Sequence, residues 1–101
     1  MTATVYATFP AREEAERIGR LMVERGLAAC VNILPPCRSI YRWQGEVETA
    51  EEVPALFKVA ADRSQTLVDA IAAEHPFEVP ALVVWPTVAA HLPFAAWVTS
   101  A

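Results

Sequence analysis

The chain of 101 residues is long enough for one domain, residues 1–101, and 54% of its residues are hydrophobic, so a packed core is expected and disorder is not. Its formal net charge of −4 argues against binding to nucleic acid, which needs a basic surface. No apolar run approaches the roughly 20 residues of a membrane span, and the start carries no signal-peptide pattern, so we expect a cytoplasmic protein without a membrane partner.

The first two elements are read from hydrophobic periodicity. Apolar and polar residues alternate over residues 2–9, which predicts a strand. Residues 11–25 repeat their apolar positions at three- and four-residue steps, which predicts an amphipathic helix. Gly26 follows as a helix-ending residue, and Gly19 inside the helix would be explained by a close approach to the sheet.

The stretch from Leu27 to Val47 is predicted to organise the chain as two strands joined by a turn at Pro35-Pro36. In the second strand Tyr41, Trp43 and Val47 point to one side. The residues expected on the other side are Arg38, Arg42, Gln44 and Glu46. The glycine at position 45 indicates a bulge or bend inside this strand.

The second half continues with alternating elements. Residues 48–52 are predicted as a turn, and residues 53–60 as a strand. Pro54 near its start indicates either an edge strand or one whose beginning is unpaired. A helix is expected over 62–74. Residues 81–85 are apolar throughout, which favours a strand buried on both faces, and a short helix opens at Leu92-Pro93.

The resulting order is βαββαβ with a C-terminal helix, which is typical of an α+β, ferredoxin-like sandwich. This architecture predicts a four-stranded sheet with both helices on one face. The other face would hold Tyr6 and part of the Tyr41/Trp43 strand. Since no helix covers it, we expect the chain to assemble with copies of itself.

The stretches LAACVNILP, SIYRWQGEVE, HPFEVP and FAAW resemble the CutA family of divalent cation tolerance proteins over almost the whole chain. The resemblance implies a ferredoxin-like protomer, a homotrimer, a cytoplasmic location and a link to copper and other divalent metals. It also implies a likeness to the trimeric PII signalling proteins, and it implies no catalytic activity.

The chain departs from the family pattern at several positions. Phe77 and Ala81 stand where the family usually has tyrosine and glutamate. The copper ligands proposed for the family fall by position on Ala7, Glu74 and His75, and only His75 is the same residue. A carboxylate is a harder ligand than imidazole or thiolate, so Glu74 suits copper less well.

His75, Glu74 and Cys37 are therefore the candidate metal-binding residues. His75 has an equally simple interpretation as the end of a helix, where imidazole hydrogen-bonds to the last carbonyl groups. Cys37 follows two prolines, whereas Cys30 lies inside an apolar strand and is expected to be structural. No cofactor is required by these patterns; copper or another divalent cation is the candidate ligand.

Two further groups of residues concern assembly. The large side chains of Tyr41 and Trp43 are predicted to fill a trimer interface, although they could also stack on a ligand. Arg42, Glu52 and Lys58 are candidates for a polar cleft between subunits. The alternative is that they are solvated charges in rim ion pairs, worth about 0–1 kcal/mol each.

The first functional hypothesis is a non-catalytic, homotrimeric divalent-cation tolerance protein that responds to metal ions and binds copper or another divalent metal weakly. The alternative is a PII-like trimeric scaffold that binds a small ligand or a partner protein at the intersubunit cleft. An enzyme is not expected, because the sequence has no glycine-rich phosphate loop, serine elbow or HExxH motif. An RNA-recognition module shares the βαββαβ order but needs basic and aromatic motifs that are missing here.

Overall fold

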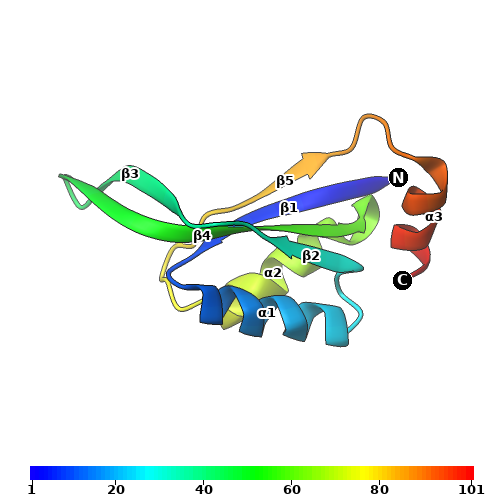
Figure 1. Cartoon of the computed structure of the whole chain (residues 1–101), viewed down its shortest axis with the longest axis horizontal. Coiled ribbons are helices and arrows are strands. Elements are labelled where there is room, and N and C mark those ends of the chain that lie inside the picture. Colours follow the sequence, from blue (N-terminus) through cyan, green and yellow to red (C-terminus); the bar gives the residue numbers. More distant parts are fainter.

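A computed structural model describes residues 1–101 as one layer of sheet with two helices packed on one face (Figure 1). A third helix lies at the end of the sheet where the chain begins. The elements in chain order are β1 (Thr2–Phe9), α1 (Arg12–Glu24), β2 (Cys30–Ile33), β3 (Cys37–Trp43), β4 (Glu46–Ala60), the 3-10 turn η1 (Ala61–Arg63), α2 (Ser64–Glu74), β5 (Leu82–Pro86) and α3 (Leu92–Ser100). None of the helices is long and apolar enough to cross a membrane.

The sheet confirms the predicted α+β class and corrects the number of strands. Its order is β2-β4-β1-β5, with every pair antiparallel, and β3 pairs with the free part of β4. Together with α1 and α2, the strands β1, β2, β4 and β5 follow the predicted βαββαβ order. The fifth strand, β3, extends the sheet into the hairpin that projects at the left of Figure 1 and gives the molecule its 45 Å length.

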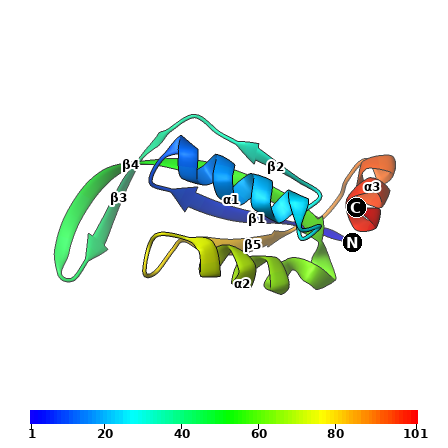
Figure 2. The same cartoon turned by 90° about the horizontal axis from the view of Figure 1, so that it is seen from below.

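The core lies between the sheet and the two helices that cover it, as the view from below in Figure 2 shows. Every second residue of β1 and of the C-terminal part of β4 points into the core, which is the alternation expected of a half-buried strand. The largest fully buried side chains are those of Phe9, Phe57, Ile18, Met22, Leu67, Ile71, Val5, Val59 and Val98.

Helix α1 confirms the predicted roles of its two glycines. A Cβ atom placed on Gly19 would lie 3.0 Å from Cγ1 of Val31, so the helix approaches β2 too closely for a larger residue to fit without movement. Gly26 has a φ of +71° directly after Arg25, which caps the helix. Both positions therefore carry glycine for a geometric reason.

The structure shows that Gln44 and Gly45 form a tight turn, not a bulge within one strand. Their φ angles are +51° and +84°, the pair of positive values that a two-residue type I′ hairpin turn requires. Trp43 pairs with Glu46 across this turn, so residues 48–52 continue β4 and the predicted turn there is wrong. Because directly paired residues share a face, Val47 lies with Arg42 and not with Tyr41 and Trp43, which also corrects the prediction.

Residues Leu34, Pro35 and Pro36 do not reverse the chain as predicted. Both β2 and β3 run antiparallel to β4 and pair with successive parts of it, so the two form one interrupted strand. Between the last pair of β2 and the first pair of β3, three residues oppose only two residues of β4, Val53 and Pro54. The prolines thus occupy a one-residue bulge.

Pro54 lies in a central strand, and the prediction of an edge strand is wrong. Its carbonyl accepts a hydrogen bond from the N–H of Leu34 at 2.9 Å, so the backbone groups of Pro54 face the bulge. A residue's N–H and C=O point to the same side of a strand, and the missing donor of Pro54 therefore costs no hydrogen bond with β1.

Strand β5 is an outer strand, so the expectation that it is buried on both faces is also wrong. It pairs only with β1, and Val83 and Trp85 are each 48% exposed. The apolar run arises because one face of β5 points toward the helices while the other belongs to the uncovered face of the sheet.

The hairpin turn yields a paired prediction on stability. Gln44→Asn is expected to raise the unfolding free energy by about 0.5–1 kcal/mol, because asparagine adopts positive φ more readily than glutamine. Gly45→Ala is expected to lower it by about 1–2 kcal/mol, because a Cβ atom is unfavourable at the φ of Gly45. Chemical denaturation of both variants tests this, and changes of the same sign would contradict the assigned turn.

Candidate functional site

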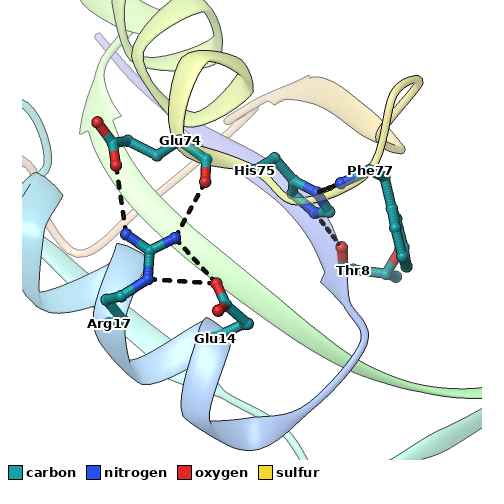
Figure 3. A network of polar contacts seen from close by, with 6 residues as sticks. All are labelled: Thr8, Glu14, Arg17, Glu74, His75 and Phe77. Carbon is teal, nitrogen blue, oxygen red and sulfur yellow. Dashed lines mark hydrogen bonds and ion pairs between the residues drawn. The ribbon is translucent and has the colours of Figure 1, made fainter.

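His75 is a buried side chain held on both nitrogens. It is 8% exposed and follows the last residue of α2 with an extended backbone. Its Nδ1 accepts the N–H of Phe77 at 3.1 Å, and its Nε2 lies 2.7 Å from the carbonyl oxygen of Thr8 (Figure 3). Because Nδ1 accepts, Nε2 carries the proton and donates to Thr8, so the imidazole is neutral.

Two aromatic rings complete the surroundings of His75. The ring of Phe9 stacks on the imidazole with a centroid distance of 4.9 Å, and the ring of Phe77 lies tilted against it at 5.0 Å. The histidine thus ties the connection after α2 to the end of β1. Binding a metal ion through either nitrogen would first require one of its two hydrogen bonds to break.

Glu74, the neighbour of His75, is engaged in a different contact. Its carboxylate lies 3.3 Å from Nη1 of Arg17 and 3.8 Å from Nη2 of Arg25, and Arg17 also pairs with Glu14 at 2.9 Å. Figure 3 shows Arg17 reaching between these acidic groups and the last carbonyl of α2. The hydrogen bonds that Arg17 donates to the carboxylates of Glu14 and Glu74 raise its pKa. Glu74 therefore joins α2 to α1 on the solvent side.

Cys37 lies on the opposite side of the sheet from His75. It pairs with Glu52, whose carboxylate accepts a hydrogen bond from the hydroxyl of Thr8 at 3.3 Å on the uncovered face. The thiol is 3.8 Å from the hydroxyl of Ser39. The structure does not bring His75, Glu74 and Cys37 together, and it contains no group of three His, Cys, Asp or Glu side chains that could hold a metal ion. Their metal-binding roles stay predictions for separate residues.

The predicted cleft residues are spread along β4 and its hairpin. Glu52 and Lys58 both face the uncovered side, but they lie six positions apart along the strand, a distance of about 20 Å. Lys58 donates to the side-chain oxygen of Asn32. Arg42 lies in the hairpin on the other side, where it bonds to the carbonyl of Gly45 at 3.4 Å. Within one chain these three residues form no common cleft.

Tyr41 and Trp43 are each 40% exposed in the single chain and lie on the side of the hairpin that continues the uncovered face. Partial desolvation and the neighbouring carboxylates of Glu48 and Glu52 raise the pKa of Tyr41. Two large rings left in solvent by one chain fit the predicted role in an interface, which stays a prediction.

Sequence patterns missed a second aromatic group on the uncovered face, formed by Tyr6 and Trp85. Their rings stack at 5.0 Å, from β1 and the outer strand β5. Burial raises the pKa of Tyr6, and the nearby Cys37 and Glu52 raise it further, so the phenol stays protonated. The alternation of β1 placed Tyr6 on this face, but only the register with β5 reveals the partner ring.

His75→Ala is predicted to lower the unfolding free energy by about 2–4 kcal/mol, because it leaves the carbonyl of Thr8 and the N–H of Phe77 unpaired and opens a cavity beside Phe9. The exposed His91 is the matched control, and His91→Ala should change stability by less than about 0.5 kcal/mol. Urea denaturation without added metal measures both. Equal, small effects would show that His75 has no structural role.

Comparisons with known proteins identify relatives over nearly the whole chain. The family model described as CutA1 divalent ion tolerance protein matches residues 3–101. The divalent-cation tolerance protein CutA of Thermus thermophilus is 39% identical over 97 residues, which are 96% of this chain and 94% of that protein. The human protein CutA is 34% identical over 96 residues, which are 95% of this chain and 54% of the human protein. The chain thus spans about half the length of the human relative.

Solved structures show the same fold. The divalent cation tolerance protein Cut A1 of Thermus thermophilus superposes with a TM-score of 0.94 at 38% identity, covering 99% of this chain and 97% of that one. The periplasmic divalent cation tolerance protein CutA of Archaeoglobus fulgidus gives a TM-score of 0.93 at 34% identity, covering 97% of this chain and 95% of that one.

Proposed function

The chain belongs to the CutA1 divalent ion tolerance family, and from this we propose that it acts in divalent-cation tolerance as a non-catalytic, cytoplasmic homotrimer that binds copper or another divalent metal weakly. The family match over residues 3–101 is the observation that carries the proposal. Because the matched residues contain every element of the fold except the first residue of β1, the shared function is expected of the whole domain and not of one grafted motif.

The uncovered face supports self-assembly. It carries Tyr6 and Trp85 on the sheet and continues to Tyr41 and Trp43 on the hairpin, with large apolar surfaces in solvent. Exposed aromatic side chains on one continuous face are typical of a surface that another subunit covers. A closed ring of three copies would cover these aromatic side chains in every chain, with none left exposed for further growth.

Within the proposal, Cys37 is the stronger candidate for copper binding and His75 the weaker. Both nitrogens of His75 are already bonded, and Glu74 is held by two arginines. The thiol of Cys37 is only half-buried, and it faces the same side as Glu52. Thiolate is a soft ligand that suits copper. Cys37 and Glu52 supply only two donors per chain, so weak retention of copper is expected unless another subunit adds a ligand.

Trp43→Arg tests the proposed assembly. Covering this face would bury the introduced guanidinium without a partner, which is strongly unfavourable, so the variant is expected to lose the trimer. Trp43→Phe keeps an apolar ring and should retain it. Light scattering after size-exclusion chromatography measures the mass of each variant. A trimeric Trp43→Arg protein with an unchanged melting temperature would show that Trp43 is not in the interface.

Copper retention tests the metal-binding part. We expect native mass spectrometry, after incubation with copper and buffer exchange, to show metal on the assembled wild-type protein and less metal on Cys37→Ser. Cys30→Ser is the matched control, because it removes the other thiol from β2, and it should retain wild-type copper. Equal retention by the wild type and Cys37→Ser would exclude Cys37 as a ligand, and a metal-free wild type would contradict copper binding.

A PII-like scaffold that binds a small ligand or a partner protein remains the second proposal. The observation that favours it is that Lys58 lies on the uncovered face, beside a cavity within the chain. A scaffold of this kind binds its ligand whether or not a metal ion is present. Its test is therefore to measure ligand binding to the metal-free protein.

A further inference from the structure

The cavity beside Lys58 lies where α3 meets the sheet, away from every residue considered for metal binding. It has a volume of about 270 Å³ and is bounded by the start of β1, the connection after β5 and the first turns of α3. Helix α3 contacts β1 and β4 there, and its side chain Val98 is fully buried. In Figure 1 this is the end of the molecule at which the N-terminus and α3 lie together.

The charge of this cavity differs from that of the molecule as a whole. The chain carries 12 acidic residues and a net charge of −4, yet no acidic side chain lines the cavity. Lys58, the only lysine of the chain, does line it, and His91 lies at the start of α3. Lys58 uses one donor on Asn32 and keeps two more, so it is able to bind a second acceptor.

The unpaired hydroxyl of a largely buried residue, Thr2, is the second, independent feature of the cavity. Thr2 is 7% exposed. It lies on the same face of the sheet as Thr4 and as Lys58, the residue of β4 that pairs with Thr4. Every fully enclosed side-chain oxygen in the chain has a hydrogen-bond partner. The hydroxyl of Thr2 makes no such bond within the chain, so it opens onto the space of the cavity that Thr2 lines. A hydroxyl that is accessible from the cavity and has no partner within the chain is free to bond to an acceptor of a ligand.

The first turn of α3 adds backbone N–H groups, whose partial positive charge has the same sign as the charge of Lys58. The N–H of Ala95 is the first that bonds to a preceding carbonyl, that of His91 at 3.0 Å, and Pro93 has no N–H. The N–H of Phe94 is therefore one of the unpaired donors of this helix end, and Phe94 lines the cavity. The positive end of the helix dipole favours an anion in this position.

From this set of donors we propose that the cavity binds a small oxyanion, the carboxylate or phosphate group of a small molecule. Lys58 supplies the charge, the hydroxyl of Thr2 and the N–H of Phe94 supply hydrogen bonds, and the apolar wall at Val98 limits the size of the ligand. The site lies within one chain and needs no metal ion. It gives the scaffold proposal a ligand class, and it does not depend on copper binding.

The test is a titration of the assembled wild-type protein, followed by the amide resonances of Thr2, Thr4 and Phe94 in nitrogen-15 NMR. Inorganic phosphate and sodium acetate are the two probes, and sodium chloride at equal ionic strength is the reference. Saturable shifts with phosphate alone would assign a phosphate group, and with acetate alone a carboxylate. Shifts that are the same in chloride, or that do not saturate, would overturn the proposal.

Matched variants locate the site. Thr2→Val removes the hydroxyl at nearly constant volume, and Lys58→Met removes the charge; each is expected to weaken oxyanion binding by about tenfold or more. Thr66→Val and Arg38→Met make the same changes at exposed positions outside the cavity and should leave the dissociation constant unchanged. Unaltered affinity in both cavity variants would overturn the proposal. A protein that retains copper but binds neither probe would refute only this inference.

Discussion

Strand β4 is the element on which the other strands depend, because three of them pair with it. Its C-terminal part lies between β1 and β2, and its N-terminal part carries β3 as a hairpin. One edge of β4 changes its partner from β2 to β3 opposite Pro54, where a bulge takes up the extra residue. A continuous backbone thus fixes the direction of the hairpin relative to the core. The hairpin needs this support, since an isolated pair of strands is marginally stable in water.

The bulge also determines which side chains reach the uncovered face. Without the extra residue, β3 would be shifted by one position against β4, and every side chain of β3 would change sides. With it, Cys37, Tyr41 and Trp43 face the same side as Glu52. Two prolines that cannot donate to a ladder are well suited to this position, because the residues of a bulge are left unpaired.

Features that depend on neighbouring residues in the chain are predicted from the sequence, whereas features that depend on the order of the strands are not. The alternation in residues 2–9 and the helical period in 11–25 predicted both elements, since local periodicity reports the buried side directly. The turn at Gln44-Gly45 has no clear signal in the sequence, because glutamine rarely adopts positive φ and the dipeptide lacks the usual asparagine or aspartate. Whether Pro54 lies in a central or an edge strand depends on the order of the strands in the sheet, and no local sequence pattern reports that order.

The candidate site was predictable only in part for the same reason. Tyr41 and Trp43 were assigned to one face correctly, because they lie two residues apart in a strand. His75 was singled out from a family position, but its use depends on contacts with Thr8 and Phe9 from the opposite end of the chain. The pairing of Cys37 with Glu52 likewise needs the register of β3, which residue spacing could not supply.

The two sides of the sheet differ in what they still have available for binding. On the side of the helices, the two candidate metal-binding residues are already paired: His75 bonds through both nitrogens, and Glu74 holds Arg17 and Arg25. On the other side, aromatic rings and a thiol are open to solvent, and Lys58 keeps unused donors. Since polar groups that bond within the chain must lose those contacts before they bind anything else, partners and ligands are favoured on the uncovered face. There the proposed covering of the hairpin by another subunit and the proposed filling of the cavity beneath α3 would involve different residues, so assembly and ligand binding are expected to respond to different substitutions.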